Sequence, residues 1–430
     1  MTVAQSSQSA PERALVPTST RWRSVAPTLL VIWIVSMLDK SNISLVIANP
    51  QFLTELQLVG KGVLLGGLAS GLFLAYGIFA PVWGWVTHRI GARKTLIISL
   101  VVWAATCVMS ALATNYAMLL TSRILLGVGE AALYPATLAL VANWFPLRER
   151  GRATSFWWIG TMIGPMITGL VVTGLIVAVG WRMQFGAMAI IALLIPLPMV
   201  WALVRDRPSD HPAANRAEVD LVSEGAIESN NDAPGRLLRA GPTVWRNYRF
   251  WLVTIAISAN AIFFWGWSIW LPTYLRTVRH FSFSTSGYLT FVIYGFAVAT
   301  ILVVGNVSDK LFRRAPFAGA GWLLGAVFLM IGAFVPNAGW AVVFMILALC
   351  SQQVGISGGE MLMHSVVGTI DMPKAQGVRS FISQIVGALS PVMIGYMLQV
   401  TGGFTGAFTV LAFAVAVSAG CMVALAREGL

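Results

Sequence analysis

The sequence predicts an all-α membrane protein with twelve transmembrane helices arranged as two pseudo-symmetric bundles of six. Three observations lead to this fold class. Hydrophobic residues make up 57% of the 430 residues and charged residues only 10%, whereas a soluble domain carries about 25% charged residues. Apolar segments long enough to cross a bilayer, which takes about 20 residues, recur along the chain. One long polar stretch, residues 205–249, separates them into two sets.

The expected helices fall into two runs, one on each side of the polar stretch. Their ranges are 27–48, 62–86, 95–113, 117–144, 152–177 and 183–204, followed by 250–275, 284–308, 316–335, 339–368, 376–399 and 402–426. The predicted organisation is a tail (1–26), a first bundle (27–204), a linker (205–249), a second bundle (250–426) and a short tail (427–430). The first tail is polar and contains no apolar run, so we expect no cleaved signal peptide.

The basic residues predict the orientation. An even number of spans places both termini on one side of the membrane, and most of the 28 Lys and Arg residues lie on that side. The exceptions are Lys61, Arg182, Arg276 and Arg279 in the opposite loops, and Lys40 and Arg123 inside spans. Because cytoplasmic loops are enriched in Lys and Arg, we expect a multi-pass protein of the cell (inner) membrane with both termini in the cytoplasm. The net charge of +12 thus reflects topology and does not indicate a nucleic-acid partner.

The first span carries an acid–base pair, Asp39 and Lys40, in the middle of its apolar segment. A charge near the bilayer centre costs roughly 2.5–3.5 kcal/mol on insertion scales, so such residues usually face a polar interior. We interpret this helix as lining a pathway. The alternative is a pair of helix-end charges that neutralise each other or reach the interface. Because adjacent helical residues point about 100° apart, one of the two should face a cavity and the other a neighbouring helix.

The fourth span carries a second acid–base pair. Arg123 and Glu130 are seven residues apart, which is two helical turns and places both side chains on one face. Gly127 and Gly129 lie between them and allow a neighbouring backbone to come close. The fourth span therefore joins the first as a candidate wall of the pathway.

The two halves of the chain repeat weakly. A glycine followed by basic residues comes after the second span, from Gly84, and again after the eighth, from Gly305. The fifth and eleventh spans open in a similar way, at Gly151 and Gly377. Two parallel repeats predict a site at their interface near the membrane midplane, reached alternately from each side.

These motifs resemble the major facilitator superfamily and, within it, the anion:cation symporter family, which includes permeases of sugar acids and aromatic acids. The resemblance covers nearly the whole chain and rests on Leu38–Asn42, Gly84–Lys94, Arg123–Pro135, Asn143–Ala153 and Trp270–Leu275. It implies proton-coupled uptake of a small organic carboxylate, such as a sugar acid or an aromatic or hydroxy acid, by alternating access. The expected partners are protons, the organic anion and the lipid bilayer, and the expected functional unit is a monomer.

The resemblance also implies roles for individual residues. Asp39 and Glu130 match the protonation sites of the family. Lys40, where the family usually has Arg, and Arg123 match the bases that handle coupling and the substrate carboxylate. Tyr76 of the second span matches a tyrosine that faces the cavity.

Two positions depart from the family pattern. His88 replaces the acid of the loop after the second span, so a charge relay there would be weakened or made sensitive to pH. Lys40 keeps a point charge but lacks the planar fork with which Arg holds a carboxylate.

A symporter needs a group whose proton affinity and substrate affinity affect each other. We expect Arg123 to pair with Glu130 in the empty protein. Protonation of Glu130 would then release Arg123 to bind a substrate carboxylate through charge-assisted hydrogen bonds. The alternative is a structural ion pair that closes the cytoplasmic side. Asp39 is the expected second proton site, with a structural salt bridge to a neighbouring helix as its alternative.

The second half offers polar groups without a family precedent. Glu360 and His364 lie one turn apart in the tenth span and form a possible polar site; the alternative is a solvated helix end. Gln384 and Asn260 lie at membrane depth and are candidates to form hydrogen bonds with substrate hydroxyls. The alternative is that they form helix–helix contacts.

Tryptophan is abundant, at 17 residues. Trp158 and Trp267 lie on spans that line the cavity in the resembled fold, and they are candidates for an apolar wall of the substrate site. Their alternative role is as interface anchors or packing residues.

Other functions are less well supported. The chain contains no nucleotide-binding loop, metal-ligand cluster or nucleophile triad, so we expect no enzyme activity, no cofactor and no metal. Proton-coupled antiport and export of organic compounds is the alternative on the same fold. Buried Lys40 and Arg123 argue against cationic drugs as its substrates, because they would repel them.

Overall fold

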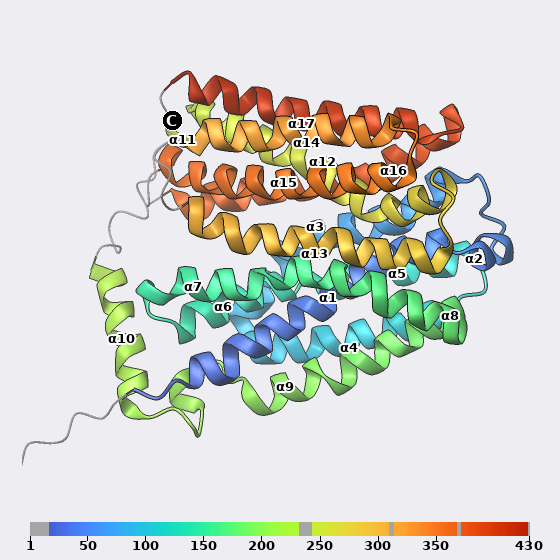
Figure 1. The fold of residues 1–430 in the computed structure, drawn as a ribbon. Coiled ribbons are helices and arrows are strands. Elements are labelled where there is room, and N and C mark those ends of the chain that lie inside the picture. The colour runs from blue at the N-terminus through green and yellow to red at the C-terminus, as the bar shows by residue number, and fades with distance from the viewer. Residues whose placement is uncertain (1–16, 232–242, 309–313, 368–370, 429–430) are drawn as a thin grey trace, which may run out of the picture.

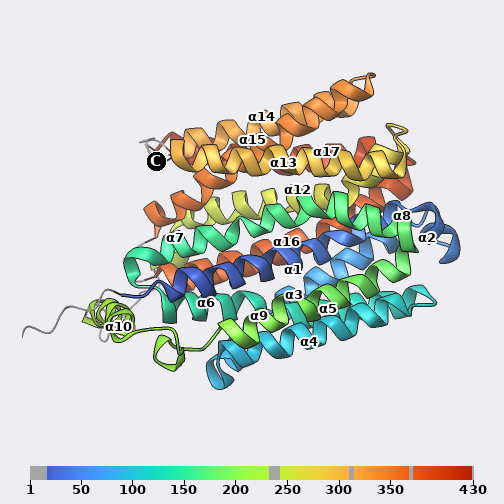
Figure 2. The same cartoon turned by 60° about the horizontal axis from the view of Figure 1, so that its bottom comes forward.

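The computed structural model describes residues 17–231, 243–308, 314–367 and 371–428, which form a bundle of long helices running side by side (Figures 1 and 2). These residues contain helices and connecting segments and no strand, which confirms the predicted all-α class. The helices before the polar stretch are α1 (Ala26–Ala48), α2 (Pro50–Glu55), α3 (Gly62–Ile90), α4 (Ala92–Ala111), α5 (Tyr116–Glu130), α6 (Leu133–Trp144), α7 (Leu147–Trp158), α8 (Gly160–Leu194) and α9 (Pro196–Leu203). A turn of π-helix, Arg21–Val25, precedes α1.

The polar stretch contains a short 3₁₀ turn, Pro208–Asp210, and two helices, α10 (Arg216–Asn231) and α11 (Thr243–Arg246). The second run of helices is α12 (Tyr248–Thr277), α13 (Phe283–Ser308), α14 (Arg314–Phe334), α15 (Ala338–Val366), α16 (Met372–Thr401) and α17 (Phe404–Ala426). We call the end of the bundle where α10 lies the tail end and the opposite end the α2 end (Figure 1).

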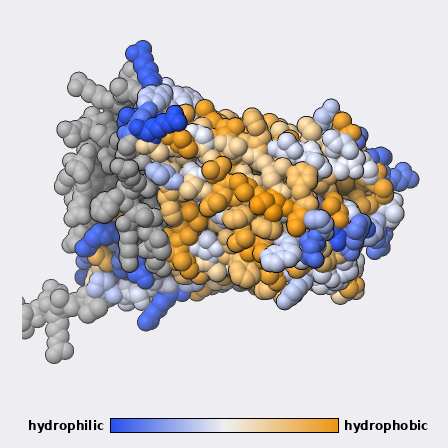
Figure 3. Space-filling model, turned by 45° about the horizontal axis from the view of Figure 1, so that its top comes forward, coloured by the Kyte–Doolittle hydropathy of each residue, from blue (hydrophilic) through white to orange (hydrophobic). Residues whose placement is uncertain are grey.

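In the described part of the chain, 11 apolar helical segments are long enough to cross a membrane. One of them, Leu147–Leu203, has 57 residues, which at about 1.5 Å per residue is far longer than the roughly 30 Å of hydrocarbon. It is interrupted at Gly180, whose φ of 81° is not helical, so it makes two crossings. The structure therefore agrees with the twelve spans expected from the sequence. A surface view shows the matching belt, apolar in the middle and hydrophilic toward both ends (Figure 3).

The fourth span differs from the expected continuous helix. It is split into α5, which ends at Glu130, and α6, which begins at Leu133. Pro135 explains the break, because proline has no backbone N–H and its ring clashes with the carbonyl four residues earlier. The break leaves Glu130 as the last residue of a helix inside the bundle.

The two halves meet along three helix pairs, α3 with α16, α8 with α13, and α1 with α12. Glycines bring the first two pairs into backbone contact. Gly62 and Gly66 of α3 lie against the backbone of Gly395 and Pro391 of α16, where a Cβ would overlap a carbonyl oxygen. Gly169 of α8 meets α13 in the same way. Because these residues lie near the α2 end, the halves are closed against each other there.

A hydrogen bond also crosses between the halves at this end. The Arg276 guanidinium at the end of α12 donates to the carbonyl of Ala48 at the end of α1, at 2.7 Å between Nη1 and O. We call this bond together with the α3–α16 and α8–α13 glycine contacts the α2-end seam.

The polar stretch is more structured than a linker prediction suggests. The start of α10 lies against the segment before α1, because Glu218 accepts the backbone N–H of Arg21 and pairs with its guanidinium at 2.9 Å. The same guanidinium pairs with Glu149 at the start of α7, and Thr18 donates its hydroxyl to Glu218 at 2.5 Å. We call Thr18, Arg21, Glu149 and Glu218 the tail clasp.

Candidate functional site

Four ionisable side chains lie together in the interior of the first half. Asp39 and Lys40 come from the middle of α1, and Arg123 and Glu130 come from α5. Asp39, Arg123 and Glu130 are 0% exposed and Lys40 is 3% exposed. We call these four residues the charge cluster. The structure thus brings the two acid–base pairs of α1 and α5 together in one place.

Lys40 is the partner of Glu130. Its ammonium lies 2.7 Å from Glu130 Oε2 and donates to the hydroxyl of Ser36, one turn earlier on α1, at 2.7 Å. The Tyr76 ring of α3 covers the same ammonium at 4.8 Å from the ring centroid, a cation–π distance. Glu130 therefore faces a cation from a neighbouring helix.

The expected pair of Arg123 with Glu130 is wrong for this conformation. Their seven-residue separation places the two Cα atoms about 10 Å apart along the α5 axis, whereas Lys40 meets Glu130 directly from α1. Arg123 instead donates from Nη2 to the backbone carbonyl of Asp39 at 3.2 Å. Its guanidinium also lies over the Phe185 ring of α8, 5.7 Å from the centroid.

Arg123 is thus a buried link between α5, α1 and α8 and is closed to a substrate in this conformation. Among the described residues, its Nε and Nη1 atoms have no hydrogen-bond partner. A buried guanidinium without its full set of acceptors is energetically costly, so Arg123 retains the capacity to bind another acceptor when the helices move.

Asp39 points away from Lys40, toward α4. Its Oδ2 accepts the indole N–H of Trp103 at 2.7 Å and lies 3.6 Å from the thiol of Cys107. Its Oδ1 accepts the amide of Asn42, three residues later on α1, at 2.5 Å. The two neighbours therefore diverge as expected, but both contact other helices: Asp39 contacts α4, and Lys40 contacts α3 and α5.

Tyr76 and Gln384 mark the place where the second half approaches the charge cluster. Tyr76 is half-buried, and its neighbour Gly77 lies against the Gln384 side chain of α16. One turn before, the Phe73 ring lies 4.1 Å from the Trp265 ring of α12, centroid to centroid. Gln384 thus stands across the interface from the Lys40–Tyr76 contact.

Asn260 lies in the middle of α12. It is 4% exposed, and its Oδ1 has no hydrogen-bond partner among the described residues. Two residues before Asn260, Ser258 of α12 shares a hydrogen bond of 2.9 Å with Ser383 of α16. Buried polar groups of the second half therefore lie on α12 and α16, two of the helices that face the first half.

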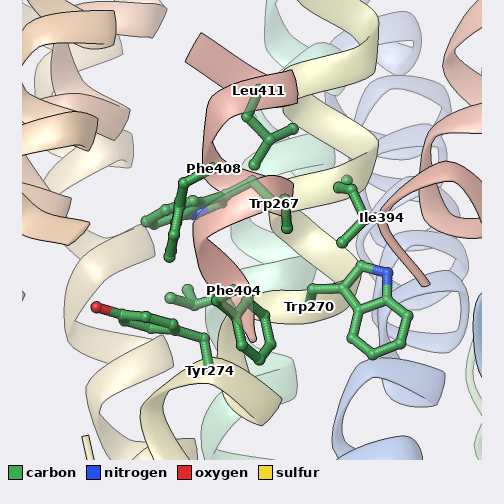
Figure 4. Close-up of a pocket in the computed structure, with 10 residues that line it drawn as sticks. Trp267, Trp270, Tyr274, Ile394, Phe404, Phe408 and Leu411 are labelled. Atoms are coloured by element: carbon green, nitrogen blue, oxygen red, sulfur yellow. The ribbon is translucent and has the colours of Figure 1, made fainter. Parts of the chain in front are cut away.

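The structure does not bring the two predicted tryptophans to this cluster. Trp158 is 48% exposed at the end of α7. Trp267 stacks on Phe263 and contacts Phe408 of α17, inside the second half. The cavity beside it has a volume of only about 10 Å³ and a lining of apolar and aromatic side chains (Figure 4). Such a space holds at most one water molecule.

The remaining candidates lie apart from the cluster. His88 is exposed near the end of α3 at the tail end, and the side chains of Glu360 and His364 lie outside the described residues. No group of His, Cys, Asp and Glu residues that could hold a metal ion occurs in the part of the chain that the structure describes.

Sequence reasoning missed several partners of the cluster. Ser36 lies four residues before Lys40, a spacing that places the two on one helix face and would have identified it. Trp103, Cys107 and Phe185 come from other spans, and no local pattern marks them. Their roles depend on how α4 and α8 pack against α1.

Comparisons with known proteins were consistent with this architecture. A family model described as the Major Facilitator Superfamily matches residues 29–391. The "Probable L-galactonate transporter" of Escherichia coli (strain K12) is 25% identical over 431 residues, covering 97% of this chain and 93% of the relative. The "Hexuronate transporter" of Bacillus subtilis (strain 168) is 26% identical and covers 88% and 89%.

Solved structures show the same fold at lower identity. A bacterial homolog of the human lysosomal transporter Spinster, in an inward-facing and occupied conformation, superposes with a TM-score of 0.74 at 16% identity and covers 94% of this chain and 96% of that one. A D-xylose-proton symporter gives a TM-score of 0.70 at 17% identity, covering 93% and 96%. These matches confirm the predicted fold class.

Proposed function

The chain belongs to the major facilitator superfamily, whose members are transporters rather than enzymes, and we propose that it takes up a small organic carboxylate together with a proton. Among organic carboxylates, sugar acids have the best support, because relatives that match along most of the chain are named for galactonate and hexuronates. Polar uncharged groups on α12 and α16, among them Gln384 and Asn260, suit the hydroxyls of such a substrate.

The Lys40–Glu130 pair is the observation that carries the proposal. Both groups are buried, and removing one charge of a buried pair typically costs about 3–5 kcal/mol because the other is left uncompensated. If Glu130 takes up a proton, Lys40 loses its counter-charge, and a substrate carboxylate that reaches it restores neutrality. Proton and anion therefore favour each other's binding, which is the reciprocal linkage that symport requires.

Lys40 replaces Arg123 as the substrate-facing base in this proposal. Lys40 forms the ion pair with Glu130 and lies under the Tyr76 ring. Tyr76 is next to Gly77, which contacts Gln384 of the second half. Arg123 keeps its position on the Asp39 backbone. Asp39 is the second proposed proton site, and its partners on α4 differ from those of Glu130.

The α2-end seam fits alternating access. We place the tail end in the cytoplasm on the strength of the Lys and Arg distribution, so the α2-end seam closes the path to the outside in this conformation. Opening it while the tail end closes would present the Lys40 region to the other side. We further propose a monomer that acts in the cell (inner) membrane.

Uptake into proteoliposomes tests the proposal. Purified protein is reconstituted and given galactonate, a hexuronate or an aromatic acid, with and without an inward proton gradient. We expect the gradient to drive accumulation of at least one sugar acid. Stimulation by a gradient of the opposite sign would contradict symport and favour the antiport alternative.

Glu130→Gln tests the coupling role separately. This variant mimics the protonated acid, so we expect it to keep exchange of internal for external substrate and to lose accumulation driven by the gradient. Asp220→Asn, an exposed acid on α10, is the matched control and should behave as the unmodified protein. Unchanged accumulation by Glu130→Gln would remove Glu130 from the coupling mechanism.

A further inference from the structure

Asp39 accepts a buried hydrogen bond from a donor that has no acceptor atom of its own. The indole N–H of Trp103 lies 2.7 Å from Asp39 Oδ2, and Trp103 and Asp39 are both 0% exposed. An indole has a donor and no acceptor, so it cannot accept the O–H of the neutral acid. Its hydrogen bond to the ionised carboxylate is also stronger than one to a neutral carboxyl oxygen. A hydrogen bond to the charged form makes that form more favourable.

Asn42 differs from Trp103, because its amide can also accept a hydrogen bond from the O–H of the neutral acid. Its Nδ2 donates to Asp39 Oδ1, and its own Oδ1 is buried without a hydrogen-bond partner among the described residues. Rotation of the amide would present this oxygen to the O–H of a protonated Asp39. The site therefore accommodates both protonation states of Asp39, and Trp103 is the group that distinguishes between them.

Helix α4, which carries Trp103, also touches the backbone beside the other acid. The Ser99 hydroxyl, one turn before Trp103, donates to the carbonyl of Gly129 at 2.8 Å, and Gly129 immediately precedes Glu130. One face of α4 thus contacts the carboxylate of Asp39 and the end of α5.

We propose that Trp103 is a positioning residue for proton coupling: its indole N–H holds Asp39 against α4 in the ionised form and sets the pH at which Asp39 takes up its proton. This inference rests on the proposed function, in which Asp39 is a proton site. The other ionisable groups that act on Asp39 are Lys40 on its own helix, Cys107 on α4, and Arg123 and Glu130 on α5. A change at Trp103 leaves all of these in place.

Trp103→Phe is the test, because it removes the N–H and keeps an aromatic ring. A hydrogen bond to a charged group contributes about 1.5–3 kcal/mol. Without it, we expect Asp39 of the variant to keep its proton to a pH about one to two units higher than in the unmodified protein. The first measurement is the pH midpoint of substrate uptake. The second is the infrared C=O stretching band of protonated Asp39, identified by its loss in Asp39→Asn and titrated without substrate.

Trp144→Phe is the matched control. Trp144 is also 0% exposed and donates its indole N–H at 2.8 Å, but to the carbonyl of Arg205, away from Asp39. We expect it to lose stability in a similar way and to leave both titrations unchanged. Cys107→Ala removes the weaker thiol donor from the same carboxylate oxygen with a small change in volume, and it should shift the infrared titration in the same direction by less.

The infrared titration separates this inference from the proposed function, because it needs no transport. An unchanged Asp39 band in Trp103→Phe would overturn the role of Trp103 even if uptake is proton-coupled. If Trp103→Phe does not fold, Trp103→Met, which also lacks the N–H, takes its place, and an unchanged Asp39 band in that variant would overturn the role of Trp103. Absence of proton-driven uptake with a shifted band would contradict the proposed function and keep the Trp103–Asp39 interaction.

Discussion

The two halves of the bundle share an architecture but differ in the chemistry of their interiors. The first half buries the charge cluster at membrane depth on α1 and α5. In the described residues of the second half, the buried polar side chains are amides, hydroxyls and indoles, with Arg379 near the start of α16 as the charged exception. Asn260 stands in the middle of α12 much as Asp39 stands in the middle of α1.

This difference suggests a division of roles between the halves. Ionisable groups can exchange protons and form the charge pairs that link proton to anion. Amides and hydroxyls cannot titrate in the physiological range, but they can distinguish the hydroxyl pattern of one substrate from another. We infer that the first half provides the coupling and that the second half provides selectivity.

Breaking the Lys40–Glu130 pair should have the largest effect. Lys40→Met leaves Glu130 buried without its cation, at a typical cost of about 3–5 kcal/mol, so we expect the initial rate of uptake to fall by more than about 100-fold. The double variant Lys40→Met with Glu130→Leu should recover thermal stability and remain inactive. Uptake by Lys40→Met within a few-fold of the unmodified protein would contradict the coupling role of the first half.

The second half supplies the matched control for this prediction. Gln352 is 1% exposed, and neither polar atom of its amide has a hydrogen-bond partner among the described residues. Replacing it with Leu removes an unsatisfied amide and should be close to neutral. An effect as large as that of Lys40→Met would mean that the halves do not differ in this way.

The α2-end seam tests how the two halves work against each other. Gly66→Ala places a methyl group against the backbone of Pro391, and overpacking of this kind typically costs about 1–3 kcal/mol. We expect a roughly 5- to 150-fold shift away from the closed α2 end, measured by the distance between spin labels placed on α2 and on the α16–α17 loop. Gly174→Ala, on α8 with open space around it, should leave the distance unchanged.

Polar residues of the second half should affect substrate affinity without affecting coupling. Asn260→Leu and Gln384→Leu each remove a candidate partner for a substrate hydroxyl, and we expect KM to rise about tenfold, the equivalent of about 1.4 kcal/mol. The pH midpoint of uptake should not move. A shifted pH midpoint would mean that these residues take part in proton coupling, which would contradict the proposed division of roles between the halves. Trp267→Phe, inside the second half, should change KM by less than about twofold.

Apolar segments made the fold predictable, and the ionisable residues inside them made much of the site predictable. A charge inside an apolar segment is costly, so the four residues of the charge cluster could be identified from the sequence. Helix spacing also predicted how the two residues of each pair point relative to each other. Helix spacing does not determine how α1 is rotated against α5. That rotation places Lys40, rather than Arg123, beside Glu130. It is set by packing across several helices.

Two other features were hidden for different reasons. Trp103 was not conspicuous because tryptophan is common in spans of this kind, and its single polar atom acts only through its contact with Asp39. Helix α10 was missed because its segment is polar and rich in residues typical of linkers. Its order near α1 depends on the contacts of one buried acid, Glu218, with residues nearly 200 positions earlier.

The tail clasp allows a comparison of the halves in which we expect the smallest effect. Its buried acid, Glu218, has a more exposed counterpart in the second half, Glu428. Burial tends to raise the pKa of Glu218, but hydrogen bonds from Thr18, Thr20 and Arg21 outweigh it and hold that pKa below its usual value. A lowered pKa contributes stability above the unfolded-state pKa of about 4.3, and this contribution is lost as the pH falls through the folded-state value. Glu218→Gln should therefore lower Tm by a few degrees at neutral pH.

The dependence on pH distinguishes this ion pair from a general loss of packing. The difference in Tm between the unmodified protein and Glu218→Gln should shrink as the pH falls below about 4, because both proteins then carry a neutral side chain at this position. Glu428→Gln removes a partner of Arg249, whose side chain is 41% exposed, and it should leave Tm nearly unchanged at every pH, since exposed pairs contribute little. A Tm difference for Glu218→Gln that stays constant with pH would assign the clasp to packing, and the carboxylate charge would then have no part in holding α10 against the first half.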